Sequence, residues 1–157
     1  MSAPSIEAIF QFEEAIENAA KSILTNSAGL TAYRQHDTAN VSAPFVALQL
    51  SGVTATETQH ADGSGNGWPS DMSATLHATV ITNRVKEGGT STHNATLGKV
   101  RRYLYDLSLW SDSLLPYHKV WMVMENGSSP TSSDDDRLDM TALSFQIRIL
   151  IRETAWP

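Results

Sequence analysis

The five histidines come first among residues that could do chemistry, because imidazole binds metal ions and moves protons near neutral pH. They are scattered along the chain, as His36, His60, His77, His93 and His118. No two of them are spaced as a helical metal-binding pair, and a metal site needs three or four converging ligands. A Ser-His-Asp triad forms only in the folded chain, so the sequence leaves it open, but no G-x-S-x-G turn is present. We expect no metal, no cofactor and no enzymatic activity.

A glycine-rich run and an aspartate run are the next candidates for a binding site. GSGNG, residues 63–67, resembles a phosphate-binding loop, but Trp68 and Pro69 follow it where a helix and a Lys-Ser/Thr pair would be needed. A flexible hairpin tip is the simpler interpretation. The other run lacks the alternating acids and central glycine of a calcium-binding loop, so we interpret it as solvated; it consists of Asp134, Asp135 and Asp136.

Charge is distributed unevenly along the chain. A basic segment contains Arg84, Lys86, Lys99, Arg101 and Arg102. An acidic segment contains Glu125, Asp134, Asp135, Asp136 and Asp139, with Arg137 among them. Opposite patches on one domain can steer and register neighbouring subunits, although distant charges can also simply balance each other. We predict both segments as candidate assembly surfaces and leave the second interpretation open.

Two tryptophans and two arginines complete the predicted assembly surface. Trp68 lies at the predicted loop tip and Trp156 near the end of the chain. Tryptophan is enriched at protein interfaces, where it acts as an anchor, although either side chain could instead fold back onto its own core. Arg148 and Arg152 point to the mixed face of the last predicted strand, where they could meet a partner.

Length and composition restrict the class of protein. The chain has 157 residues, 41% of them hydrophobic, which indicates one globular domain spanning residues 1–157. It has no cysteine, which excludes disulfides and thiolate metal sites. The net charge of −6 argues against a protein that holds nucleic acid through its phosphates. No signal peptide or membrane-spanning run is present, so we expect a soluble protein with no membrane partner.

Hydrophobic periodicity then predicts the elements that position these residues. A helix is expected over 5–25, with an apolar stripe on one side and, in its first two-thirds, several glutamates, which is the charge polarity that a helix macrodipole favours. A second helix is expected over 92–110, its stripe running from Leu97 to Leu107. Short strands are expected over 31–34, 45–50 and 120–124, and long alternating strands over 72–84 and 140–152.

Loops complete the predicted order. Residues 60–70 are expected to form the tip of a long hairpin, and residues 125–137 a polar loop. The predicted fold class is α+β, a single mostly antiparallel sheet with two helices packed on one face and a long projecting β-hairpin.

The sequence resembles the tail-terminator (tail-completion) proteins of long-tailed bacteriophages, the family that includes the phage lambda terminator. An acidic N-terminal helix precedes the strand PFVALQL and a glycine-rich hairpin, and MSATLHATVITNR leads into the helix HNATLGKVRRYLYDL. The ending DMTALSFQIRILIRETAWP is the most reminiscent part. The resemblance covers almost the whole chain, in layout rather than in a diagnostic motif.

The resemblance implies a structural virion protein of the tail or neck that acts without catalysis and assembles in the host cytoplasm. Its partners would be other copies of itself in a ring of six, the tail-tube protein and the head-tail connector proteins. Six spheres with the radius of gyration of about 15 Å expected for this chain length leave a central hole near 39 Å. DNA would pass through that lumen without specific binding.

Two alternatives remain open at this level. A head-closure or tail-adaptor ring of the neck would have the same appearance in sequence. A small-ligand-binding or hydrolytic α+β domain is the more distant alternative, with His77 and aspartate loops around a cleft.

Overall fold

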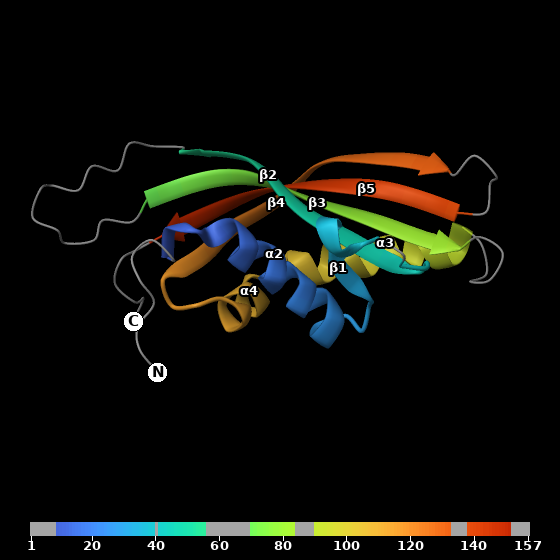
Figure 1. The fold of residues 1–157 in the computed structure, drawn as a ribbon, viewed down its shortest axis with the longest axis horizontal. Coiled ribbons are helices and arrows are strands. Elements are labelled where there is room, and N and C mark those ends of the chain that lie inside the picture. Colours follow the sequence, from blue (N-terminus) through green and yellow to red (C-terminus); the bar gives the residue numbers. More distant parts are fainter. Residues whose placement is uncertain (1–8, 40, 56–69, 84–89, 133–137, 152–157) are drawn as a thin grey trace, which may run out of the picture.

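One open sheet of five strands organises the chain in the computed structural model, which describes residues 9–39, 41–55, 70–83, 90–132 and 138–151 (Figure 1). The strand order is β1-β2-β3-β5-β4. The first pair, β1 with β2, is parallel and the other pairs are antiparallel. The strands are β1 Ala32–Arg34, β2 Phe45–Ala55, β3 Ser70–Asn83, β4 His118–Ser132 and β5 Leu138–Ile151. The predicted α+β class with a mostly antiparallel sheet is confirmed.

The strict alternation of β5 separates a core face from a helix-free face. Leu143, Phe145 and Ile147 are fully buried, whereas the residues between them are only half-buried. Their partners on β3 are small or apolar, and Ile147 lies opposite Ala74. This is the period-2 pattern expected for a strand with one face against a core, so the predicted register of β5 is confirmed.

Helices cover the core face and leave the other face without a helical layer (Figure 1). They are α2 Phe12–Ser22, a π-helical turn Ile23–Ser27, α3 Thr90–Leu104 and α4 Leu107–Ser113. The predicted apolar stripe of the first helix is confirmed, since Phe12, Ile16 and Ile23 are buried. None of the helices in the described ranges is long and apolar enough to cross a membrane.

The single helix predicted over 92–110 is wrong, because the chain breaks it into α3 and α4. Asp106 adopts an extended conformation and caps α4, with its carboxylate accepting the Ser108 N–H at 3.1 Å. The hydrogen bond from the Ser108 hydroxyl lowers the pKa of Asp106. Leu107, predicted to continue the apolar stripe, is 39% exposed, whereas Trp110 is fully buried. The side-chain cap overrides the apolar spacing here.

The short strand predicted over 120–124 is also wrong. β4 runs for 15 residues and includes most of the segment predicted as a polar loop. Its register shifts between Val120 and Met122 and again between Glu125 and Gly127. Pro130 pairs with Thr141 inside the strand. Proline and bulges are tolerated because β4 is the last strand of the sheet, where one side of the backbone needs no partner strand.

The described strands end at opposite ends of the sheet where the two hairpins are formed: β2 ends beside the start of β3 at one end, and β4 ends beside the start of β5 at the other. At one end, Ser70 of β3 pairs with Ile151 of β5; at the other, Asn83 pairs with Leu138. The β2–β3 connection therefore leaves from the first end and the β4–β5 connection from the second. The predicted tip, residues 60–70, lies almost wholly outside the described residues.

Replacing Ile147 with aspartate should unfold the protein. The side chain is fully buried, and an unpaired carboxylate there costs several kcal/mol, a large share of the stability of a domain. Circular dichroism and thermal melting provide the measurement. Met124→Asp, at a 48% exposed position on β4, is the matched control and should melt near the parent. A cooperative parent-like melt for Ile147→Asp would contradict the assigned register.

Candidate functional site

Most residues predicted for an assembly interface lie outside the described residues. They are Trp68, Arg84, Asp134, Asp135, Asp136, Arg137, Arg152 and Trp156. The structure describes Lys99, Arg101, Arg102 and Arg148, and it does not bring them together. The first three lie on α3 and Arg148 lies on β5.

Arg101 joins the predicted basic and acidic segments within one chain. Its guanidinium donates two hydrogen bonds to Glu125 of β4, from Nε to Oε2 at 2.8 Å and from Nη2 to Oε1 at 3.0 Å. This paired geometry, the strong form of an arginine–carboxylate contact, raises the pKa of Arg101. Arg101 therefore fastens α3 to β4.

Arg148 is held on the helix-free face of the sheet. Its guanidinium donates to the Asp71 carboxylate on the neighbouring strand β3 and lies 4.6 Å from the centre of the Trp121 ring. Trp121 occupies the first irregularity of β4. A cation between a carboxylate and an aromatic face is well fixed, so this cluster gives the sheet face an ordered charged feature. No pattern in the sequence indicates the contact between Arg148 and Trp121.

Lys99 and Arg102 lie at the surface of α3. Both are exposed, and neither is joined to a carboxylate by an ion pair within the described part of the chain. The Arg102 guanidinium lies 5.1 Å from the centre of the Tyr103 ring, which limits its freedom.

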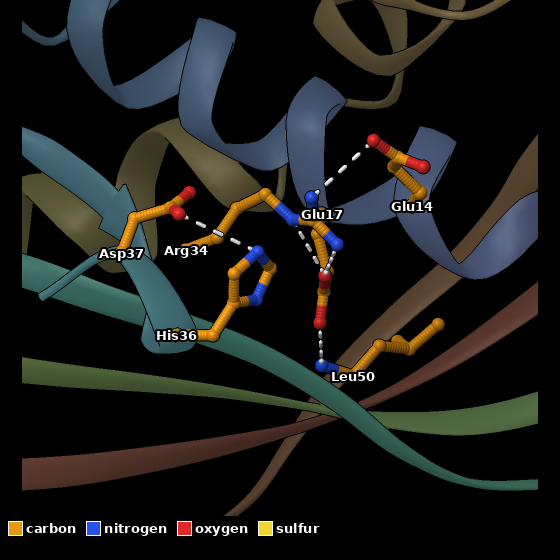
Figure 2. Close-up of polar contacts among 6 residues, drawn as sticks. All are labelled: Glu14, Glu17, Arg34, His36, Asp37 and Leu50. Atoms are coloured by element: carbon orange, nitrogen blue, oxygen red, sulfur yellow. Dashed lines mark hydrogen bonds and ion pairs between the residues drawn. The ribbon is translucent and has the colours of Figure 1, made fainter.

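The buried carboxylate of Glu17, on α2, accepts a hydrogen bond from a backbone N–H group near one edge of the sheet (Figure 2). β1 pairs with β2 only as far as Leu48, and the Leu50 N–H donates to Glu17 Oε2 at 2.8 Å. Arg34, the last residue of β1, donates from Nε to Glu17 Oε1 at 2.8 Å. From the sequence, Glu17 was expected only as one of the acids in the first part of this helix; in the structure its carboxylate links a helix and two strands. Glu14 contacts the same arginine from an exposed position.

At the opposite edge of the sheet, formed by β4, a side chain also binds a backbone N–H group. The Glu125 N–H donates to the Tyr105 hydroxyl at 2.9 Å, and the Tyr105 ring packs edge-on against Phe145 with centroids 5.9 Å apart. Bulges and Pro130 interrupt the rest of β4. Such features discourage a further strand from adding to a sheet. Among the described residues, both edges are therefore poorly suited to pairing with another chain.

His77, named for the hydrolytic alternative, lies on the helix-free face between two serines. Its Nε2 lies 3.0 Å from the Ser51 hydroxyl and its Nδ1 lies 3.2 Å from the Ser144 hydroxyl. A catalytic triad needs one ring nitrogen bonded to a carboxylate, and hydroxyls occupy both here. The arrangement observed is that of cross-strand polar contacts on a sheet surface.

His93 is buried, and each of its two ring nitrogens contacts a side chain. It projects from α3, with Nδ1 2.8 Å from the Thr82 hydroxyl of β3 and Nε2 2.8 Å from the Thr141 hydroxyl of β5. Burial lowers the pKa of His93, while the charge of Asp139 opposes this effect. The neutral ring fits both contacts, because one nitrogen donates and the other accepts. His93 thus fixes the first half of α3 to the sheet.

A hollow of about 170 Å³ lies where the π-helical turn ends against the start of β2 and the first half of α3. Threonines and apolar residues line it, among them Thr31, Phe45 and Thr92, and no ionisable side chain does. Small-molecule sites usually occupy about 300–1,000 Å³ and contain a few converging polar groups. Among the described residues, no three His, Asp or Glu side chains lie close enough together to hold a metal ion.

Comparison with known proteins found similarity to solved structures and none to protein families or curated sequences. No protein-family model matches the sequence. No curated protein matches it significantly. A similar solved structure is a chain described as "Virion of native gene transfer agent (GTA) particle", with 16% sequence identity and a TM-score of 0.45. The match covers 93% of this chain and 95% of that chain. A similarity at this level assigns no function by itself.

Glu17→Gln should destabilise the protein by about 2–3 kcal/mol, because it removes a charged partner from Arg34 and weakens the acceptor for Leu50. Glu14→Gln is the matched control, since Glu14 contacts the same arginine with 69% of its side chain exposed, and it should cost less than about 0.5 kcal/mol. Urea unfolding measures both. Equal effects would contradict the linking role of Glu17.

Acid should weaken the protein in part through His93. Because its folded-state pKa lies below the ordinary value of 6.5, the stability it contributes is complete above that pH and declines as the pH falls below it. His93→Gln should lower stability at pH 7 by about 1 kcal/mol, through a lost hydrogen bond. It should also lose less stability than the parent between pH 7 and pH 5. Urea unfolding over a pH series provides the test, and identical pH slopes would contradict it.

Proposed function

We propose that this protein is a structural subunit of a virion. In this proposal copies form a closed ring, most simply of six, that caps the tail tube, ends its polymerisation and joins it to the head connector. The layout shared with tail-terminator proteins motivates the proposal. A subunit of such a ring needs several separate surfaces that can contact neighbouring proteins.

The one-sided sheet is the observation that carries this proposal. Helices cover one face only (Figure 1), and the strands of the two hairpins, β2–β3 and β4–β5, end at opposite ends of the sheet. A domain of this shape can contact neighbours through its helices, its bare sheet face and both ends. An enzyme or a ligand-binding protein instead needs an enclosed pocket with converging polar groups. The hollow near α3 is small and has no ionisable side chain in its lining.

The charge of the chain is compatible with a DNA conduit. A net charge of −6 repels phosphates, so DNA passing through the ring would not be retained. A protein that held DNA would need clustered cations instead.

Light scattering on the purified chain tests the ring. The expected result is a discrete oligomer of six subunits whose mass does not grow with concentration, because a closed ring leaves no free contact. Adding it to a tail-tube protein that is assembling into tubes should shorten the tubes that form, as seen by electron microscopy. An unrelated protein of similar size and charge serves as the control and should leave tube length unchanged.

Other outcomes separate the alternatives. A ring that ignores tube ends but binds the head connector would indicate a head-closure or adaptor protein. A chain that stays monomeric and leaves tube length unchanged would contradict the proposal.

A further inference from the structure

The exposed side of α3 has a composition that its own fold does not explain. Ala95, Gly98, Lys99 and Arg102 are all exposed and follow the i, i+3, i+4, i+7 spacing of a single helical stripe. Glycine within a helix weakens it relative to alanine. A Cβ added at Gly98 would meet nothing within 4 Å, so no contact inside the described chain requires glycine there.

This stripe, defined by those four residues, is flat and basic. Small side chains at Ala95 and Gly98 let another surface approach the helix backbone closely. Lys99 and Arg102 supply two positive charges, and α3 from Thr90 to Leu104 contains no aspartate or glutamate. The ring of Tyr103 limits the motion of Arg102, which reduces the entropy lost on binding.

A surface of opposite character lies on two other helices of the same chain. α2 and α4 pack against each other, and exposed carboxylates lie on both, at Glu13 and Asp112 among others. Large apolar side chains are exposed at the ends of these helices: Leu107, the first residue of α4, is 39% exposed, and Phe10 and Leu115, which lie two residues outside α2 and α4, are 42% and 52% exposed. Apolar anchors with charged residues around them are the usual composition of a protein interface.

We infer that the stripe on α3 of one copy docks against the α2–α4 surface of the next copy. This inference rests on the proposed ring and specifies its contact. Opposite charges make the two surfaces complementary, and because they are different surfaces the contact is head-to-tail, as a closed ring requires. Strand addition is a poor alternative, since Glu17 and Tyr105 occupy backbone groups at the two sheet edges.

Charge exchange tests the contact. In the first variant, Lys99→Glu and Arg102→Glu, an acidic stripe faces the acidic α2–α4 surface of its neighbour. In the second, Glu13→Lys and Asp112→Lys, a basic surface faces the basic stripe. None of these four side chains has an ion-pair partner within the described residues, so both variants should fold. Each alone should sediment as a monomer, with at least a tenfold loss of association.

Mixing the two variants in equal amounts should restore the oligomer, because every contact then joins opposite charges in an alternating ring. Asp37→Lys, at an exposed position outside both surfaces, is the control and should assemble like the parent. Circular dichroism checks the fold of each variant.

The results distinguish this contact from the ring itself. If the parent and both variants form rings, the proposed contact is wrong but the proposed ring is not. The same holds if the parent forms rings and the two variants stay monomeric when they are mixed. A parent that remains monomeric with and without tube protein would remove both.

Discussion

Backbone hydrogen bonding at the ends of short strands is the constraint on which this fold depends. β1 supplies partners for only three residues of β2, and a strand that continues beyond its neighbour leaves N–H groups that cannot be buried unpaired. The Glu17 carboxylate accepts one of these groups while holding Arg34, so α2, β1 and β2 are fixed by a single side chain. At the other edge of the sheet the Tyr105 hydroxyl accepts a backbone N–H from within the last strand, that of Glu125 in β4. These two contacts hold the helical layer to the sheet at both of its edges.

Between these margins the helices are positioned by packing and by His93. Ile16 of α2 and Trp110 of α4 are fully buried in the core, and the His93 imidazole joins α3 to two strands through threonine hydroxyls. The opposite face receives no helix, and its polar groups pair across strands, as His77 does with Ser51 and Ser144. The molecule therefore has one face organised for stability and another whose order comes from hydrogen bonds between neighbouring side chains.

Much of the fold could be predicted from periodicity, because alternation and helical spacing report burial directly. β5 and the stripe of α2 were predicted for this reason. The second half of β4, beyond Met124, was missed because Gly127 and Pro130 are typical of loops, and only the position of β4 at the sheet edge makes them tolerable. The break at Asp106 was missed because Leu107 continues an apolar spacing that the cap interrupts.

The candidate site was less predictable, for a different physical reason. Exposure of Lys99 and Arg102 follows from the helical pattern of α3. The partners of Arg101 and Arg148 lie 24 and 77 residues away, and local patterns contain no information on such pairs. The contacts of Glu17 could not be predicted for the same reason, because its partners Arg34 and Leu50 lie 17 and 33 residues further along the chain.

The arrangement of β3 and β5 also has a mechanical consequence. Each strand has 14 residues, so the pair forms a strut roughly 46 Å long whose ends lie beside the two hairpin connections. Tension applied between those connections runs parallel to the strands and perpendicular to their hydrogen bonds, so the rungs of the ladder share the shear load. Rupture then requires many bonds to fail at once instead of one after another, which suits a part that must withstand pulling along that axis.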